Sequence, residues 1–205
     1  MRKSIAFDLD GTLIDVSKRD YQIYADLVNK LGGTPLSYPV YWPLRQAKTD
    51  IHQVLADSHI TSDEQIDVFL VERKTLMESM EYLSIDELFP DSISVLDKLS
   101  KDFDIHILTI RHNKSNTESQ LRSLGLDRYH CHIVSGNKGE QLQLIPNIYL
   151  MVGDTENDIL PANTLGIKSV AATTGIRNRQ LLSEMNPTYI VDGLGEIEIL
   201  LYGRK

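Results

Sequence analysis

The sequence has little of several features that mark particular classes of protein. Cys131 is its single cysteine, so no disulfide can form within the chain, and this usage suits a reducing compartment. Acidic residues outnumber basic residues, and the net charge of −8 argues against a nucleic-acid partner, whose binding needs a basic face on the protein. No apolar run approaches the roughly 20 residues of a membrane span. Met-Arg-Lys-Ser at the start leads directly into an apolar stretch without room for a signal peptide, so we expect a cytoplasmic protein.

The stretch that organises the chain covers residues 5–13, Ile-Ala-Phe-Asp-Leu-Asp-Gly-Thr-Leu. Its apolar start predicts a buried strand, which delivers two carboxylates, Asp8 and Asp10, at its carboxyl end. Side chains two residues apart on an extended chain point the same way, and two neighbouring anions repel unless a cation or a proton separates them. Ligands of open α/β sheets bind at this end of the strands. The stretch therefore predicts a divalent metal ion beside a place for acid–base chemistry.

Residues 16–85 show helical periodicity and contain no convincing strand. Apolar residues recur at helical spacing over Tyr21–Leu31, where two glycines end the helix, then over Thr49–Ser58 and again from Thr61. About seventy residues of helix inserted after the first strand predict a small separate layer, such as a lid.

This insertion is rich in aromatic residues, with Tyr38, Tyr41 and Trp42 within five positions. We interpret them as the core of the helical layer, and stacking on a sugar or base of a substrate is the alternative. Arg45 and Lys48 are candidates for contact with an acidic substrate.

Strands and helices alternate regularly in the remainder of the chain. The apolar runs predict strands over 104–110, 130–134, 148–152 and 168–172 and helices over 91–101 and 138–144, with another ending at Gly166. Ser115-Asn116-Thr117-Glu118 predicts a capping box that opens a helix closed by Gly125. Alternation of this kind is typical of βαβ units. We expect an α/β fold, a doubly wound parallel sheet of residues 1–15 and 86–205 with an inserted all-helical domain of residues 16–85.

Three of the predicted strands end in polar side chains. Thr109 lies at the end of the second strand, and Asp154 and Asp158 follow the strand over 148–152. The carboxyl ends of parallel strands share one edge, so these groups can converge with Asp8 and Asp10. Carboxylates are the hard ligands that Mg²⁺ prefers, and the turn after Thr109 offers backbone N–H groups to a phosphate.

These motifs together resemble those of the haloacid dehalogenase (HAD) superfamily. The resemblance rests on Asp8-Leu9-Asp10-Gly11-Thr12, on Thr109 after an apolar strand, on Lys138, and on Gly153-Asp154 followed by Asp158. Within this superfamily, the sequence is similar in particular to the phosphatase branch that includes phosphoglycolate phosphatases. The insertion lies where that family has its helical cap. The resemblance implies a Rossmann-like core and a Mg²⁺-dependent phosphatase, a hydrolase of a small phosphorylated metabolite that works as a monomer or homodimer.

The resemblance also implies a role for each motif residue. Asp8 is the expected nucleophile, which forms an aspartyl-phosphate, and Asp10 is the expected general acid and base. Thr109 and Lys138 are expected to bind the substrate and to stabilise charge on the transferring phosphoryl group. Arg111, which follows Thr109 closely, is a further candidate for substrate binding. The implied Mg²⁺ ligands are Asp8, the backbone carbonyl of Asp10, Asp154, and Asp158 through water or as a brace.

Some residues leave alternatives open. Only 16 positions separate Lys138 from Asp154, fewer than is usual in the family, and Lys114 is a possible substitute. His130-Cys131-His132 places two histidines on one face of a strand with the cysteine opposite, which favours packing or surface exposure over a zinc site. We interpret Arg177-Asn178-Arg179 as a solvated loop, and contact with an anionic substrate is the alternative.

Other functions fit the same motifs. A phosphomutase would use these residues and return the phosphoryl group to a sugar, and hydrolysis of pyrophosphate needs no new motif. A regulatory or binding protein on a retained fold is the alternative of another class, and turnover would exclude it. Asp10 argues against the dehalogenase branch, which lacks this second acid.

Overall fold

The computed structural model describes residues 2–203, and the chain divides into two compact units. One unit contains the chain up to Asp15 and the chain from Glu87 onward, and the other is the insertion Val16–Asp86. No helix among the described residues is both long and apolar enough to cross a membrane.

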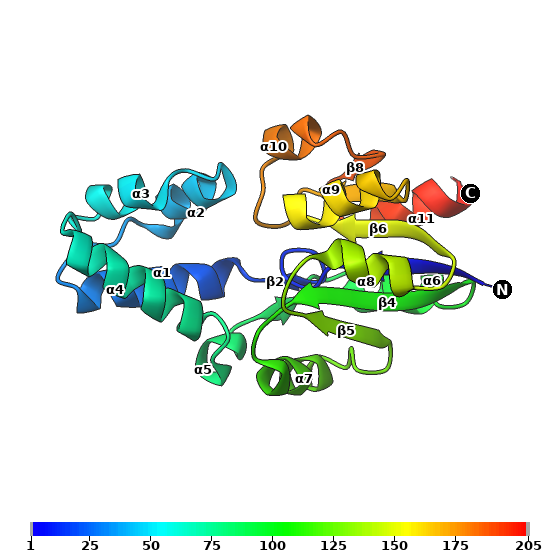
Figure 1. The fold of residues 1–205 in the computed structure, drawn as a ribbon, viewed down its shortest axis with the longest axis horizontal. Coiled ribbons are helices and arrows are strands. Elements are labelled where there is room, and N and C mark those ends of the chain that lie inside the picture. The colour runs from blue at the N-terminus through cyan, green and yellow to red at the C-terminus, as the bar shows by residue number, and fades with distance from the viewer. Residues whose placement is uncertain (1, 204–205) are drawn as a thin grey trace. The chain divides into compact units, whose positions relative to one another are not determined.

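A six-stranded parallel sheet forms the centre of the first unit. The strand order across the sheet is β5-β4-β1-β6-β7-β8 (Figure 1). The strands are β1 (Lys3–Phe7), β4 (Phe103–Ile110), β5 (His130–Val134), β6 (Ile148–Gly153), β7 (Lys168–Ala172) and β8 (Tyr189–Val191). β1 lies between β4 and β6, with Lys3 beside Phe103 and Ile5 beside Leu150.

Helices cover both faces of this sheet, which confirms the predicted α/β class. They are α6 (Ser92–Leu99), α7 (Lys114–Ser123), α8 (Lys138–Leu144), α9 (Glu156–Thr164), α10 (Arg179–Glu184) and α11 (Gly195–Tyr202). Ala6, Leu108 and Met151 form one core with Leu142 of α8 and Ala162 of α9. In Figure 1, α8 and α9 lie in front of the sheet and α6 and α11 behind it. A strand covered on both faces reads as a continuous apolar run, which explains the pattern of β1 and β6.

One local prediction is wrong. The N-cap of α7 is Asn113, whose side-chain oxygen accepts a hydrogen bond from the backbone N–H of Asn116 at 3.1 Å. Ser115 therefore lies inside the first turn and does not open a capping box. The C-terminal end of α7 agrees with the prediction that Gly125 closes the helix, because Gly125 follows it with φ of +69°.

The regular elements within Val16–Asp86, all of whose residues are described, are helices. They are α1 (Ser17–Lys30), α2 (Tyr38–Gln46), α3 (Ile51–Asp57), α4 (Asp63–Leu76) and α5 (Met80–Leu83). This unit has its own core, in which the rings of Tyr24 and Tyr41 stack with centroids 4.1 Å apart and Phe69 packs edge-on against Tyr24. Tyr41 is 1% exposed and thus belongs to the core.

A buried carboxylate ties the helices of the insertion together. Asp20 is fully buried and accepts hydrogen bonds from Tyr41, from Arg73 at 2.7 Å and from Arg45 at 3.2 Å. Although burial opposes ionisation, the two guanidinium groups hold the pKa of Asp20 below its ordinary value. Arg45, a candidate for contact with an acidic substrate, is thus held by a carboxylate of its own unit.

The two segments that flank the insertion pair in a short antiparallel ribbon. β2 (Ile14–Asp15) pairs with β3 (Glu87–Leu88), and the backbone N–H of Phe89 donates to the carbonyl of Leu13 at 3.0 Å. The chain therefore leaves the sheet-containing unit and returns to it at adjacent positions.

Candidate active site

Asp8 stands directly at the carboxyl end of the central strand. Its backbone N–H donates to the carbonyl of Val152 at 2.8 Å, which continues the hydrogen bonding between β1 and β6 past the last residue of β1. Asp8 is 6% exposed. The strand therefore fixes this carboxylate where ligands of open α/β sheets bind.

Asp154 follows β6 and is fully buried beside Asp8. Its two carboxylate oxygens accept hydrogen bonds from the Thr12 hydroxyl at 3.3 Å and from the backbone N–H of Ile176 at 2.6 Å. Gly11 and Gly175 press their backbones against this carboxylate, and a β-carbon on either would collide with it. Gly11 also has φ of +78°, a conformation that favours glycine. Gly11 and Thr12, in the turn after β1, thus shape the site of Asp154, which follows β6.

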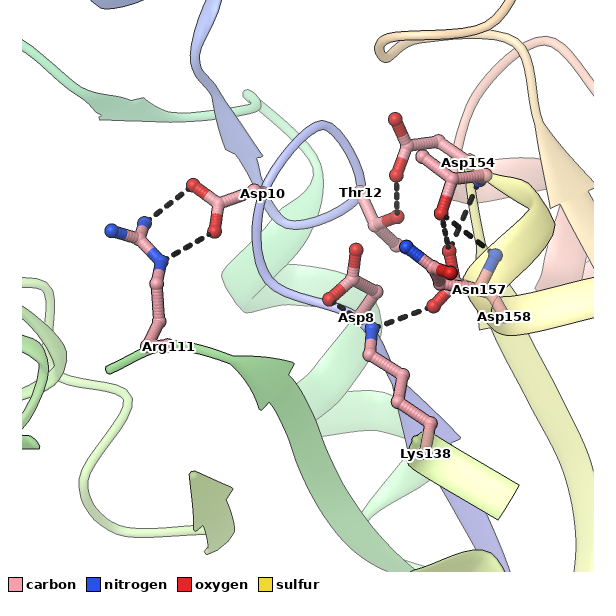
Figure 2. Close-up of polar contacts among 9 residues, drawn as sticks. Asp8, Asp10, Thr12, Arg111, Lys138, Asp154, Asn157 and Asp158 are labelled. Carbon is pink, nitrogen blue, oxygen red and sulfur yellow. Dashed lines mark hydrogen bonds and ion pairs between the residues drawn. The ribbon is translucent and has the colours of Figure 1, made fainter. Parts of the chain in front are cut away.

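Asp158 and Lys138 complete the cluster (Figure 2). One oxygen of Asp158 accepts from both the backbone N–H and the hydroxyl of Thr155, at 3.0 and 2.8 Å, in the capping box of α9. The Lys138 ammonium donates to the other Asp158 oxygen at 2.6 Å and to Asp8 Oδ1 at 2.5 Å. Lys138 is the first residue of the seven-residue helix α8 and is 3% exposed.

Lys138 reaches the cluster despite its short spacing from Asp154, because α8 is brief and β6 follows it closely. Lys114, the alternative, has a side chain that is 75% exposed and lies 3.7 Å from Glu118, on its own helix. The structure therefore brings Lys138, and not Lys114, to the carboxylates.

Burial and mutual repulsion dominate the electrostatics of the cluster. Burial, and then the charge of Asp158, raise the pKa of Asp8 to about 7 even though Lys138 opposes the shift. Burial, followed by the charges of Asp8 and Asp158, raises the pKa of Asp154 well above its ordinary value. Burial alone would lower the pKa of Lys138, but the two carboxylates that it contacts outweigh burial and raise it. The cluster thus holds more negative charge than one ammonium can neutralise.

A divalent cation fits this donor set. One carboxylate oxygen from each of Asp8, Asp154 and Asp158 lies within 4.8 Å of the others, and all three residues are buried. Oxygen donors alone suit a hard cation of the Mg²⁺ type. The excess negative charge is what such an ion would neutralise.

Asp10 turns away from this cluster and pairs with Arg111 (Figure 2). Arg111 donates from Nε to Asp10 Oδ2 at 2.8 Å and from Nη2 to Oδ1 at 2.5 Å. Extended chain would have pointed Asp8 and Asp10 the same way, but β1 ends at Phe7 and Asp10 lies in the following turn. The Asp10 side chain is therefore outside the carboxylate group, which leaves only its backbone carbonyl as an expected metal ligand.

Thr109 lies on β4, two residues before Arg111, and is 1% exposed. β4 runs beside β1 with Ile107 level with Phe7, so Thr109 lies level with the start of the turn that carries Asp10.

Sequence reasoning missed one ion pair beside the site. Arg177 is 8% exposed and donates from Nε and Nη2 to the two carboxylate oxygens of Glu156, at 2.8 and 3.0 Å. The interpretation of Arg177 as part of a solvated loop is therefore wrong. Glu156 lies in the first turn of α9, and its position two residues after Asp154 was the available signal.

The histidine segment of β5 packs against β4. His132 Nε2 lies 2.9 Å from His106 Nδ1, and the ring of His106 also stacks on that of His130. Among the residues that the structure describes, the carboxylate group is the one with metal-binding spacing. The segment thus follows the packing interpretation, with a cross-strand partner that the sequence pattern did not show.

The chain is similar in sequence and in fold to known proteins of one family. The model of the family described as haloacid dehalogenase-like hydrolase matches residues 5–172. The chain is 28% identical to a phosphoglycolate phosphatase of Vibrio parahaemolyticus, over 95% of this chain and 94% of the relative. It is 30% identical to a phosphoglycolate phosphatase of Neisseria gonorrhoeae, over 95% and 91% of the two chains. A haloacid dehalogenase-like family protein of Streptococcus pneumoniae has a similar fold, with a TM-score of 0.76 and 23% identity over 99% of each chain.

Proposed function

This chain belongs to the haloacid dehalogenase-like hydrolase family as a phosphatase, and from that premise we propose that it hydrolyses a small phosphate monoester with Mg²⁺ through an aspartyl-phosphate. The observation that carries the proposal is the buried cluster in which Lys138 bridges Asp8 and Asp158 beside Asp154. A nucleophilic carboxylate, a fixed cation and a cation-binding group of oxygens lie together at the end of the central strand.

Asp8 is the nucleophile of this mechanism. Lys138 holds Oδ1, and Oδ2 attacks phosphorus, so that an Asp8–phosphorus bond forms while the bond to the ester oxygen breaks. Asp10 gives a proton to the departing oxygen and then takes one from the water that attacks the aspartyl-phosphate. That second attack releases inorganic phosphate and restores the Asp8 carboxylate.

Positioning and charge stabilisation come from the surrounding residues. Lys138 and Thr109 bind the phosphoryl oxygens and stabilise the charge that develops on them. Asp158 fixes Lys138 and is itself fixed by Thr155, which suits a bracing role. Asp8, Asp154 and the backbone carbonyl of Asp10 would hold Mg²⁺, which neutralises carboxylate and phosphoryl charge when bound.

The insertion is the cap of this mechanism and excludes water from the reaction. Its separate core and its return to the other unit at the β2–β3 ribbon support this role. The names of the relatives make phosphoglycolate the first ester to test.

Phosphate release from a panel of compounds, with Mg²⁺ and with chelator, tests the proposal. The panel holds phosphoglycolate, sugar phosphates, nucleotides, pyrophosphate and a chromogenic aryl phosphate. We expect Mg²⁺-dependent release from a monoester that Asp8→Asn abolishes, whereas the exposed control Asp127→Asn retains the wild-type rate.

Three outcomes would contradict the proposal. Release by Asp8→Asn at the wild-type rate would exclude the nucleophile, and release from pyrophosphate alone would indicate a pyrophosphatase. Transfer of phosphate between positions of a sugar, followed by phosphorus NMR, would indicate a phosphomutase.

A further inference from the structure

The segment that follows β7 reaches Asp154 with its backbone. We call this segment, residues 174–177, the strap. The Thr174 hydroxyl donates to the carbonyl of Gly11 at 2.9 Å, and the backbone N–H of Ile176 donates to Asp154 Oδ2 at 2.6 Å. The strap is therefore tied to the turn after β1 and, at the same time, to a carboxylate that the proposed function gives to the metal ion.

Both oxygens of Asp154 are directed by fixed donors. The Thr12 hydroxyl donates to Oδ1 at 3.3 Å, while Ile176 holds Oδ2 (Figure 2 shows the Thr12 contact). A carboxylate oxygen has two lone pairs, so each oxygen can still bind a cation. The backbones of Gly11 and Gly175 press against the same group, and Asp154 is fully buried. Rotation of this carboxylate would break these contacts, so it presents its oxygens in one orientation.

A buried ion pair anchors the strap to the helix that begins beside Asp154. Arg177, the last residue of the strap, donates from Nε and Nη2 to the two carboxylate oxygens of Glu156, at 2.8 and 3.0 Å. Glu156 is the first residue of α9 and lies two positions after Asp154. A bidentate pair of this kind fixes geometry as well as contributing energy. The pair therefore holds the neighbouring N–H of Ile176 in place at Asp154.

The contacts of Arg177 favour this anchoring role over contact with an anionic substrate. Its side chain is 10% exposed. Nε and Nη2 donate to Glu156, and Nη1 donates to the carbonyl of Ile176 at 3.4 Å, so each guanidinium nitrogen has a partner within the chain. The carboxylate of Glu156 also matches the charge of Arg177. The pair thus contributes position to the site and leaves its net charge unchanged.

A fixed Asp154 affects one ion more than another. Mg²⁺ binds oxygen ligands at about 2.0–2.1 Å in a nearly ideal octahedron, whereas Ca²⁺ accepts roughly six to eight oxygens at about 2.3–2.6 Å and can take both oxygens of one carboxylate. Selectivity between the two ions depends on the size and the flexibility of the site. A carboxylate held at both oxygens suits the smaller ion and cannot turn to give both oxygens to the larger one.

We propose that the Arg177–Glu156 pair makes the site select Mg²⁺ over Ca²⁺, because it holds the strap and, through Ile176, the orientation of Asp154. The inference rests on the proposed function and deepens it, since it concerns the ion of the same site. Arg177 and Glu156 are positioning residues that act on the ion through Asp154. Loss of the pair loosens the strap, and the preference for the smaller ion falls.

Mn²⁺ reports binding at this site without turnover. It prefers oxygen ligands in an octahedron, as Mg²⁺ does, and the electron paramagnetic resonance signal of free Mn²⁺ shows how much of it is bound. Titration with Mg²⁺ or Ca²⁺ as a competitor then gives the affinity of the protein for each ion. Asp154→Asn identifies the share of Mn²⁺ that binds at this site.

The main variant combines Glu156→Gln with Arg177→Met, which removes both charges of the pair and keeps the net charge of wild type. Loss of a residue that orients a metal ligand typically lowers metal affinity about 10- to 100-fold. We expect the affinity for Mg²⁺ to fall at least about tenfold and that for Ca²⁺ to change less than about threefold. Asp127→Asn combined with Arg122→Met removes an exposed ion pair and is the matched control, with wild-type affinities.

Two single variants separate position from charge. In Arg177→Met, loss of a positive charge would by itself strengthen the binding of both cations, whereas loss of position weakens the binding of Mg²⁺, which is the result we expect. Arg177→Lys keeps the charge without the planar fork, so its preference for Mg²⁺ should lie between those of wild type and the double variant. Thermal melting in chelator shows that each protein is folded. If the double variant does not fold, Arg177→Lys decides: a lowered preference supports the inference and a wild-type preference overturns it.

The outcomes separate this inference from the proposed function. Equal changes in the affinities for the two ions would show that the pair affects only charge or stability, and unchanged affinities would show that the strap does not depend on it. Either result overturns the inference, while Mg²⁺-dependent phosphate release that Asp8→Asn abolishes would leave the proposed function standing. Mn²⁺ binding that Asp154→Asn does not lower would refute the metal site that the proposed function requires.

Discussion

Replacing Gly175 with alanine should impair the site without changing any residue that carries chemistry. A β-carbon at Gly175 would lie 2.6 Å from the carbonyl oxygen of Gly11 and closer still to the carboxylate of Asp154. Ordinary van der Waals contact begins at 3.4 Å, so Gly11 alone must move by about 0.8 Å and Asp154 by more. A misplacement of about 1 Å can cost about 100-fold in rate. We therefore expect kcat/KM to fall about 100-fold. We also expect a rise in the Mg²⁺ concentration that gives half of the maximal rate.

The assay is phosphate release at varied Mg²⁺ concentration, with thermal melting of the same samples. Overpacking costs about 1–3 kcal/mol, which leaves a folded protein. Gly193→Ala is the matched control, because a β-carbon there meets nothing within 4 Å, and it should retain wild-type kinetics. Wild-type kcat/KM and Mg²⁺ dependence in folded Gly175→Ala would show that the position of Asp154 does not control the reaction.

Three further perturbations have defined outcomes. Lys138→Met removes the cation shared by two buried carboxylates, so phosphate release at saturating Mg²⁺ should fall at least about 100-fold; a smaller loss would argue against its role in charge stabilisation. Asp20→Asn removes the buried carboxylate that pairs with the partly buried Arg73 and should destabilise the protein by about 3–5 kcal/mol in urea unfolding, whereas an unchanged midpoint would show that the contact is energetically neutral. Burial and two neighbouring imidazoles lower the pKa of His106 from 6.5 to about 4, so the unfolded chain binds this proton more tightly. Stability from His106 is complete above about pH 6.5 and is lost toward pH 4, by about 3 kcal/mol for this buried ring. His106→Gln should flatten melting temperature against pH over that range, and an identical profile would contradict the assignment.

The sheet could be predicted because its strands are short apolar runs bounded by polar turns. β5 and β7 were expected with the bounds that the structure gives, and so was helix α8. A strand buried on both faces has a composition that does not depend on which strands flank it. The central place of β1 between β4 and β6 depends on pairing across 100 residues or more, which periodicity does not record.

Helix α2 was missed for a local reason. Proline occurs at its start and again at Pro43 inside it, and a proline inside a helical pattern is normally taken as the end of a helix. Packing of Tyr41 against Tyr24 stabilises this segment, and such contacts are invisible to a pattern within a short window.

The candidate site likewise contains some residues whose place could be predicted from the sequence and one whose direction could not. Lys138, Asp154 and Asp158 could be located because each follows or opens an element whose end lies on one edge of a parallel sheet. The direction of Asp10 could not, because it depends on where β1 stops and on Arg111, a residue 101 positions away. The expected roles of Asp8 and Asp10 remain predictions that the kinetic experiments decide.

The placement of β1 also has a consequence during synthesis. This strand is the earliest in the chain, yet Lys3 pairs with Phe103 and Ile5 with Leu150. At about 5–20 residues per second a ribosome needs roughly 7–30 s to deliver β6 after β1. Ile5, Ala6 and Phe7, fully buried in the folded protein, lack one or both of their neighbouring strands for that time, while the local contacts of Val16–Asp86 can already form. The insertion is therefore expected to fold first on the nascent chain, while the apolar strand that leads to Asp8 is exposed and can bind a chaperone.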